Sequence, residues 1–224
     1  MVNEVLQVFG FLLTVLGWLL SIVTCSISSW KRSDVKGEVI ESITRTTGLW
    51  IRCTQQATGH WTCDNYDSYF LGLPVPLQGA RATTLLSLLL GFFGILLAIF
   101  GLSCTTIAAE NARLKARMVV ASGMLHVAGG VSLGTGVCWF AATVLQDYQN
   151  PGNQVSAGRY VYGEALFVGW AAMVVGILGG IAMCISSWST KDDDDHHHHH
   201  HMERHIPPYT YNPPRPKQNS TEYI

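Results

Sequence analysis

Long blocks of hydrophobic residues, separated by polar segments, set the pattern of this chain. Four such blocks cover residues 8–27, 82–104, 118–145 and 165–186. Each is long enough to cross a bilayer core, which is roughly 30 Å thick and takes about 20 residues of helix. The blocks do not alternate with period two, and only helices or closed barrels satisfy their backbone inside a bilayer. The pattern therefore predicts four transmembrane helices.

The polar segments around these blocks define the predicted topology. They are residues 1–7, 28–81, 105–117, 146–164 and 187–224. An even number of spans places both ends of the chain on one side of the membrane. Segment 105–117 carries three basic residues against one acidic residue, an excess that favours the cytoplasm. Residues 31–80 carry five basic and five acidic residues, so their charge does not indicate on which side of the membrane they lie.

Two cysteines decide the orientation. Cys53 and Cys63 lie close together in a polar segment rich in β-branched residues, which predicts a disulfide across a hairpin. Such a bond forms in an oxidising compartment, so we expect segments 28–81 and 146–164 outside the cell and both termini in the cytoplasm. The other cysteines lie in the apolar blocks or at their edges, and we interpret them as membrane thiols: Cys25, Cys104, Cys138 and Cys184.

Segment 28–81 is expected to form a small antiparallel sheet. Its β-prone pieces are residues 31–35, 39–44, 49–54 and 61–65, with turns marked by Gly37, Gly48 and Gly59. Residues 66–73 are expected to form a short helix that ends before Pro74. Trp50 is a large apolar side chain in a polar loop, so it needs a small core or a membrane surface to pack against.

The third apolar block contains an ionisable residue, His126. A histidine inside a membrane span suggests a functional site, but the spans hold no acidic residue to pair with it. The alternative interpretation is a neutral, hydrogen-bonded packing histidine. Glycines recur in the second, third and fourth blocks, which favours close helix packing in a bundle over a cofactor groove.

Composition and motifs argue against an enzyme or a nucleic-acid binder. Charged residues make up 13% of the chain and the formal net charge is −1, which gives nucleic acid no basic surface. No catalytic motif is recognisable, so we expect no catalytic residue, no metal site and no cofactor.

The tail from Ser187 is polar and proline-rich and is expected to be disordered. Within it, aspartates 192–195 and histidines 196–201 resemble an inserted expression tag, and a native metal-binding tract is the alternative.

The residues around the cysteine pair resemble those of the claudins, a family of tetraspan proteins of tight junctions. The matching residues of the first loop are Trp30, Gly48, Leu49, Trp50, Cys53 and Cys63. A second match is an acidic-aromatic turn ending in Asn150-Pro151, followed by the entry 163–170 to the fourth block. The resemblance extends over residues 5 to 186. It implies a membrane α-helical fold: a left-handed four-helix transmembrane bundle with a small extracellular antiparallel β-sheet.

The resemblance implies a tight-junction structural protein of the plasma membrane, which polymerises into strands between cells and controls paracellular ion permeability. Asp64 matches the position of the pore acid in cation-pore claudins, and Gln56 matches a second pore position but carries no charge. A cation-selective pore is therefore expected. The alternatives are an Asp64 that is merely solvated or paired with Arg52 or Lys31, a sealing claudin, and a regulatory tetraspan of the wider peripheral-myelin-protein and calcium-channel-γ superfamily.

The resemblance also implies contact sites. Residues expected to touch claudins of the opposite cell are Tyr148, Gln149, Asn150, Pro151 and Tyr160, and Tyr69 is expected to touch a claudin of the same membrane. Cys104 and Cys184 are candidate palmitoylation sites. The chain ends in Glu222-Tyr223-Ile224, and PDZ domains bind a free carboxylate that follows an apolar side chain. The expected partners are therefore other claudins, PDZ scaffolds of the zonula occludens type, and membrane lipid.

Overall fold

The computed structural model describes residues 2–33, 43–56, 58–66, 72–102, 112–149 and 160–203. The chain divides into two units, Met1–Thr190 and Lys191–Ile224. The first unit contains the helical bundle and the sheet, and the second begins within the last helix of the chain.

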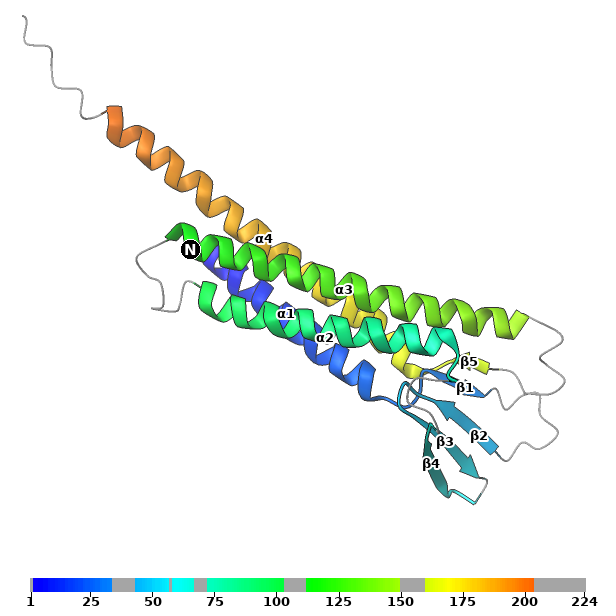
Figure 1. Cartoon of the computed structure of the whole chain (residues 1–224). Coiled ribbons are helices and arrows are strands. Elements are labelled where there is room, and N and C mark those ends of the chain that lie inside the picture. Colours follow the sequence, from blue (N-terminus) through cyan, green and yellow to red (C-terminus); the bar gives the residue numbers. More distant parts are fainter. Residues whose placement is uncertain are drawn as a thin grey trace, which may run out of the picture. The chain divides into compact units, whose positions relative to one another are not determined.

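Four long helices form the bundle (Figure 1): α1 (Val2–Ser26), α2 (Val75–Gly101), α3 (Ala112–Gln149) and α4 (Glu164–Glu203). All four are long and apolar enough to cross a membrane, which confirms the prediction of four spans. Each helix begins before its apolar block. Helix α2 starts at Val75, directly after Pro74, because its first turns pack against protein. Hydropathy alone does not register these turns, since they contain Gln78 and Arg81.

Helix α4 continues to Glu203, although the sequence predicted a disordered tail from Ser187. A physical reason lies in the composition of the intervening residues. Between Gly180 and Pro207 the chain contains neither glycine nor proline, the residues that most strongly end a helix. Residues 204–224, including the predicted PDZ ligand, lie outside the described residues.

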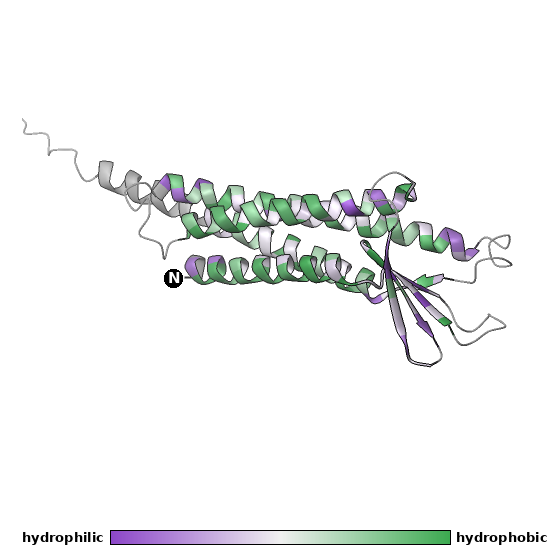
Figure 2. Cartoon of the chain, turned by 60° about the horizontal axis from the view of Figure 1, so that its bottom comes forward, coloured by the Kyte–Doolittle hydropathy of each residue, from purple (hydrophilic) through white to green (hydrophobic). Residues whose placement is uncertain are grey.

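The helices present large apolar side chains outward and small residues to one another. Leu12, Phe93 and Leu178 are each more than half exposed, as expected of side chains that face lipid, and Figure 2 shows hydrophobic residues along all four helices with hydrophilic ones towards their ends. Inside the bundle, a Cβ on Gly17 would lie 2.8 Å from the Cα of Gly176. Helices α1 and α4 therefore meet backbone to backbone, as small residues permit.

A five-stranded antiparallel sheet stands at one end of the bundle (Figure 1). Its strands are β1 (Lys31–Ser33), β2 (Ile43–Thr47), β3 (Ile51–Gln56), β4 (Trp61–Asn65) and β5 (Tyr160–Tyr162), in the order β4-β3-β2-β1-β5. This confirms the predicted sheet. The sequence did not predict β5, because three residues are too few to show an alternating pattern.

Two local expectations differ from the structure. The second strand is Ile43–Thr47 rather than 39–44, and residues 34–42 lie outside the described part. Its position follows from the tight link at Gly48, whose N–H donates to the carbonyl of Ile51 at 2.9 Å. The short helix expected at 66–73 does not reach its predicted end, because Gly72 has a φ of +94°, which lies outside the helical region. Residues 67–71 lie outside the described part.

Candidate functional site

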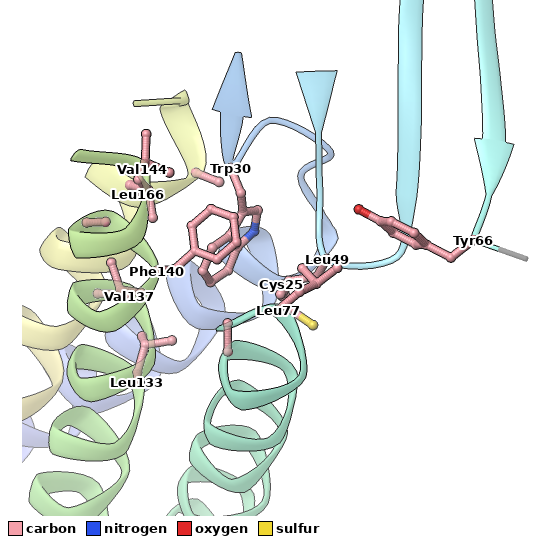
Figure 3. Packing of buried hydrophobic residues seen from close by; sticks show 14 residues of the cluster. Cys25, Trp30, Leu49, Tyr66, Leu77, Leu133, Val137, Phe140, Val144 and Leu166 are labelled. Carbon is pink, nitrogen blue, oxygen red and sulfur yellow. The ribbon is translucent and has the colours of Figure 1, made fainter. Parts of the chain in front are cut away.

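The first loop is attached to the bundle through a buried core beneath the sheet (Figure 3). Trp30 is fully buried, and its indole N–H donates to the carbonyl of Thr24 at 3.0 Å. Its ring meets Phe140 of α3 edge to face, with 5.3 Å between ring centroids. Burying a tryptophan this completely, with its N–H paired, fixes the start of β1 against the helices.

Gly48 and Leu49 form a second attachment. A Cβ on Gly48 would lie 2.5 Å from the Cα of Ser28, so only glycine permits this approach between the β2–β3 link and the end of α1. Leu49 is fully buried. Trp50 is 40% exposed, and its N–H points at the sulfur of Cys25 at 3.4 Å. The residues predicted from the family resemblance thus come together where the sheet is attached to the helical bundle.

Arg81 lies at the centre of this attachment between sheet and bundle, and the sequence did not identify it. It is only 5% exposed, and its Nε donates to the carbonyl of Leu49 at 2.6 Å. Its guanidinium lies 5.0 Å from the ring centroid of Trp50 and 5.1 Å from that of Tyr66. Burial raises the pKa of the Tyr66 phenol, against the opposing effects of Arg52 and Arg81. The sequence signal that could have found it was an arginine in an apolar helical stretch that matches the family.

The predicted disulfide joins Cys53 and Cys63. The two residues are directly opposed across β3 and β4, with their Cα atoms 4.1 Å apart. Cys53 is buried and Cys63 is exposed. The bond therefore ties the edge strand β4 to the rest of the sheet.

The strand register places a set of polar residues on one face of the sheet. Starting from Asp64 and moving across the paired strands, the side chains on the same side are those of Arg52, Gln56, Arg45 and Lys31. We call this set the Asp64 face. Its members Arg45, Arg52, Gln56 and Asp64 are exposed, and Lys31 is half-buried. The two residues that the sequence associated with a pore, Asp64 and Gln56, therefore share a solvent-exposed face.

Asp64 lies directly opposite Arg52, but the two do not form an ion pair. In the described part of the chain, the ion pair found is Arg32–Glu164, with Nη1 and Oε1 3.3 Å apart. The guanidinium of Arg52 instead lies 4.6 Å from the ring centroid of Tyr66. The carboxylate of Asp64 thus remains open to solvent on the edge strand, with a positive charge nearby on its own face.

The segment between α3 and α4 contributes to the same sheet. Tyr160 in β5 is half-buried and stands opposite Ser33. The amine of Lys31 lies 4.4 Å from the centroid of its ring. Burial lowers the pKa of the Lys31 amine, while Asp147 acts in the opposite direction. Tyr148 and Gln149 lie exposed at the end of α3, so they belong to a different element from Tyr160.

A polar link holds the start of α4 to β1, and the sequence offered no sign of it. The carboxylate of Glu164 accepts a hydrogen bond from the hydroxyl of Ser29 and pairs with Arg32. Next to it, the N–H of Gly163 donates to the carbonyl of Trp30 at 3.0 Å. The two loops are therefore joined at the base of the sheet.

Several predicted residues lie outside the described part: Tyr69, Cys104, Asn150, Pro151, Glu222, Tyr223 and Ile224. Cys184 is described. It is half-buried, and its thiol points at the carbonyl of Val120 on α3 at 3.8 Å. Among the described residues no group of three or more His, Cys, Asp and Glu is arranged to hold a metal ion.

Comparisons with known proteins agree with this architecture. Residues 4–183 match the model of the PMP-22/EMP/MP20/Claudin family. The chain is 38% identical to human Claudin-19 over 185 residues, which is 82% of each chain. It is 38% identical to Claudin-3 of Rattus norvegicus over 182 residues, which is 81% of this chain and 82% of the relative. Human Claudin-6 is 37% identical over 185 residues, covering 82% of this chain and 83% of the relative. The four-helix bundle, the disulfide-linked sheet and these matches together establish that the chain belongs to the claudins of the PMP-22/EMP/MP20/Claudin family.

Proposed function

We propose that this claudin controls paracellular ion permeability through the Asp64 face, and that Asp64 makes the ion path favour cations. As a claudin, the chain is a multi-pass membrane protein of tight junctions and a structural protein rather than an enzyme, and it associates with other claudins. The finer proposal rests on one observation. Asp64 is an exposed carboxylate, without an ion pair in the described chain, on the same face as Gln56.

The sign of the selectivity follows from electrostatics. Two carboxylates about 8 Å apart repel by about 0.5 kcal/mol in bulk-like dielectric, and by more as the path narrows. A hydrated cation between them relieves that repulsion, whereas an anion meets a barrier. Copies of Asp64 on claudins that face one another across the path would supply such a pair of charges.

A barrier role is the second candidate function. Arg45 and Arg52 are exposed on the same face as Asp64. Two cations beside one carboxylate oppose the entry of cations and weaken the attraction that Asp64 exerts. The two candidates differ in which of these charges faces the ion path.

Replacing Asp64 by asparagine is expected to lower the permeability of sodium relative to chloride and to leave junction localisation intact. The substitution removes the negative charge and keeps the size of the side chain. The measurement is a dilution potential across an epithelial layer that lacks other claudins. Thr62→Asn on the same face serves as the control and should leave the ratio unchanged. A barrier role holds instead if the wild-type layer only raises resistance, or if Asp64→Asn keeps the wild-type ratio.

We also propose the orientation of the chain. The sheet lies outside the cell and both termini lie in the cytoplasm, because the Cys53–Cys63 bond belongs to an oxidising compartment. Exposed apolar side chains on all four helices, such as Phe93 and Leu178, then face membrane lipid.

The contacts that build strands are assigned to the loops. Exposed Tyr148 and Gln149 at the end of α3, with Asn150, Pro151 and Tyr160, are proposed to touch claudins of the opposite cell. A tyrosine suits this task because its ring is apolar and its hydroxyl polar. Tyr69 is proposed to contact a claudin in the same membrane.

The tail is proposed to connect the strand to the cytoplasm. Glu222, Tyr223 and Ile224 supply a free carboxylate after an apolar side chain, which PDZ scaffolds of the zonula occludens type bind by strand addition and carboxylate capture. Cys104 and Cys184 are proposed palmitoylation sites. A cytoplasmic thiol near the end of a membrane span places an attached acyl chain next to the bilayer.

A further inference from the structure

The four helices line a small cavity that the proposed function does not use. Its walls include Thr14 and Ser21 of α1, Ser87 of α2, His126 of α3 and Gly176 of α4. These residues lie away from the ends of their helices. The cavity leaves about 20 Å³ for the centre of a water-sized molecule, and roughly 10–15 Å³ of such space holds one water.

His126 has a hydrogen-bonding atom without a partner at this cavity. Its side chain is 4% exposed, and its Nδ1 lies 2.9 Å from the carbonyl of Ser122. Since a carbonyl only accepts, Nδ1 must carry the proton, which leaves Nε2 as an acceptor. Nε2 is buried and receives no hydrogen bond within the described part of the chain. An unsatisfied buried acceptor is destabilising.

The neighbouring hydroxyl groups on α1 do not donate a hydrogen bond to Nε2 of His126. Thr14 donates its hydroxyl proton to the carbonyl of Phe11 at 2.7 Å, and Ser21 donates to Gly17 at 2.8 Å. Their oxygen atoms retain lone pairs and can still accept. The residues that line this space therefore include more than one hydrogen-bond acceptor.

We propose that this cavity binds a water molecule, which donates one proton to Nε2 of His126 and the other to a hydroxyl oxygen of the wall. Water fits because it has two protons for two acceptors. A metal ion does not, because the wall has a single imidazole and no carboxylate. Dry cavities in proteins are lined by apolar groups alone, whereas this lining includes an imidazole and the hydroxyl-bearing side chains of Thr14, Ser21 and Ser87.

Gly176 provides a sharp variant. It is buried, it lines the cavity, and a Cβ placed on it meets no atom within 4 Å. Gly176→Ala therefore puts a methyl group into the cavity without a clash. If a water is bound there, the methyl group displaces it and leaves Nε2 unpaired.

The direct test is solid-state NMR of the full chain in lipid bilayers with labelled histidine. Magnetisation transferred from water should reach the His126 ring, assigned by sequential correlation along α3, and should be lost in Gly176→Ala. Val174→Ala on the exposed side of α4 is the control and should leave the transfer unchanged. The proposal is overturned if the wild-type ring receives no magnetisation from water, or if Gly176→Ala leaves the transfer intact.

Discussion

Replacing Arg81 by methionine is expected to destabilise the protein by on the order of 3 kcal/mol and to prevent most of it from reaching the cell surface. Methionine keeps the length of the side chain but cannot donate to Leu49, whose carbonyl is paired with Arg81 at 2.6 Å. A buried acceptor left unsatisfied costs about 1–3 kcal/mol. The ring of Trp50 also loses its cation, and Tyr66 loses one cation but retains Arg52; each such contact is worth about 0.5–2 kcal/mol.

The measurement is thermal unfolding of the purified chain in detergent, together with surface labelling of cells. Arg113→Met is the matched control, because Arg113 is an exposed arginine at the start of α3 and should tolerate the change. An Arg81→Met protein as stable and as well delivered as the control would mean that Arg81 does not hold the sheet on the bundle.

Loss of the Cys53–Cys63 bond is the second large effect. The double variant Cys53→Ser, Cys63→Ser is expected to lower the free energy of unfolding by about 2–3 kcal/mol, because the bond closes a short loop and so limits the unfolded chain. Since β4 is an edge strand held on one side only, the loss should first appear as exposure of the β3–β4 hairpin. Hydrogen exchange of the backbone amides of Trp61 to Asn65 measures it.

A control distinguishes the loss of the disulfide from the loss of a thiol group. Cys138 is free and exposed on α3, so Cys138→Ser should change neither stability nor exchange. In a chain whose other cysteines are serine, a maleimide should label neither Cys53 nor Cys63 until a reductant is added. Labelling without reductant would contradict the assignment.

Features that depend on local composition were predictable. Each apolar block is long enough to specify a span by itself, and the two cysteines lie ten positions apart among β-branched residues, which suffices to predict a hairpin. Trp30, Gly48 and Leu49 were recognised through their resemblance to a family, and the structure explains them: two fill the core beneath the sheet, and the third allows the backbones to approach.

Features that depend on contacts between distant segments were not predictable. Strand β5 exists because Tyr160–Tyr162 pairs with β1, far away in the chain. The link between Glu164 and Ser29 has the same origin. Arg81 was not singled out in the sequence, and its role emerges only when Leu49 and Tyr66 lie against it. Hydropathy also placed the start of α2 too late, because it does not distinguish burial in protein from burial in lipid.

The central claim is that charge on the Asp64 face sets ion selectivity, and paired substitutions test it most directly. Arg52 stands opposite Asp64 on that face, so Arg52→Gln and Asp64→Asn change the local charge in opposite directions. The measurement is the sodium-to-chloride permeability ratio from dilution potentials, in the same claudin-deficient epithelial layer and with junction localisation verified. We expect Arg52→Gln to raise the ratio above wild type and Asp64→Asn to lower it. Ratios that move in the same direction, or that stay at the wild-type value in both correctly localised variants, would contradict the claim.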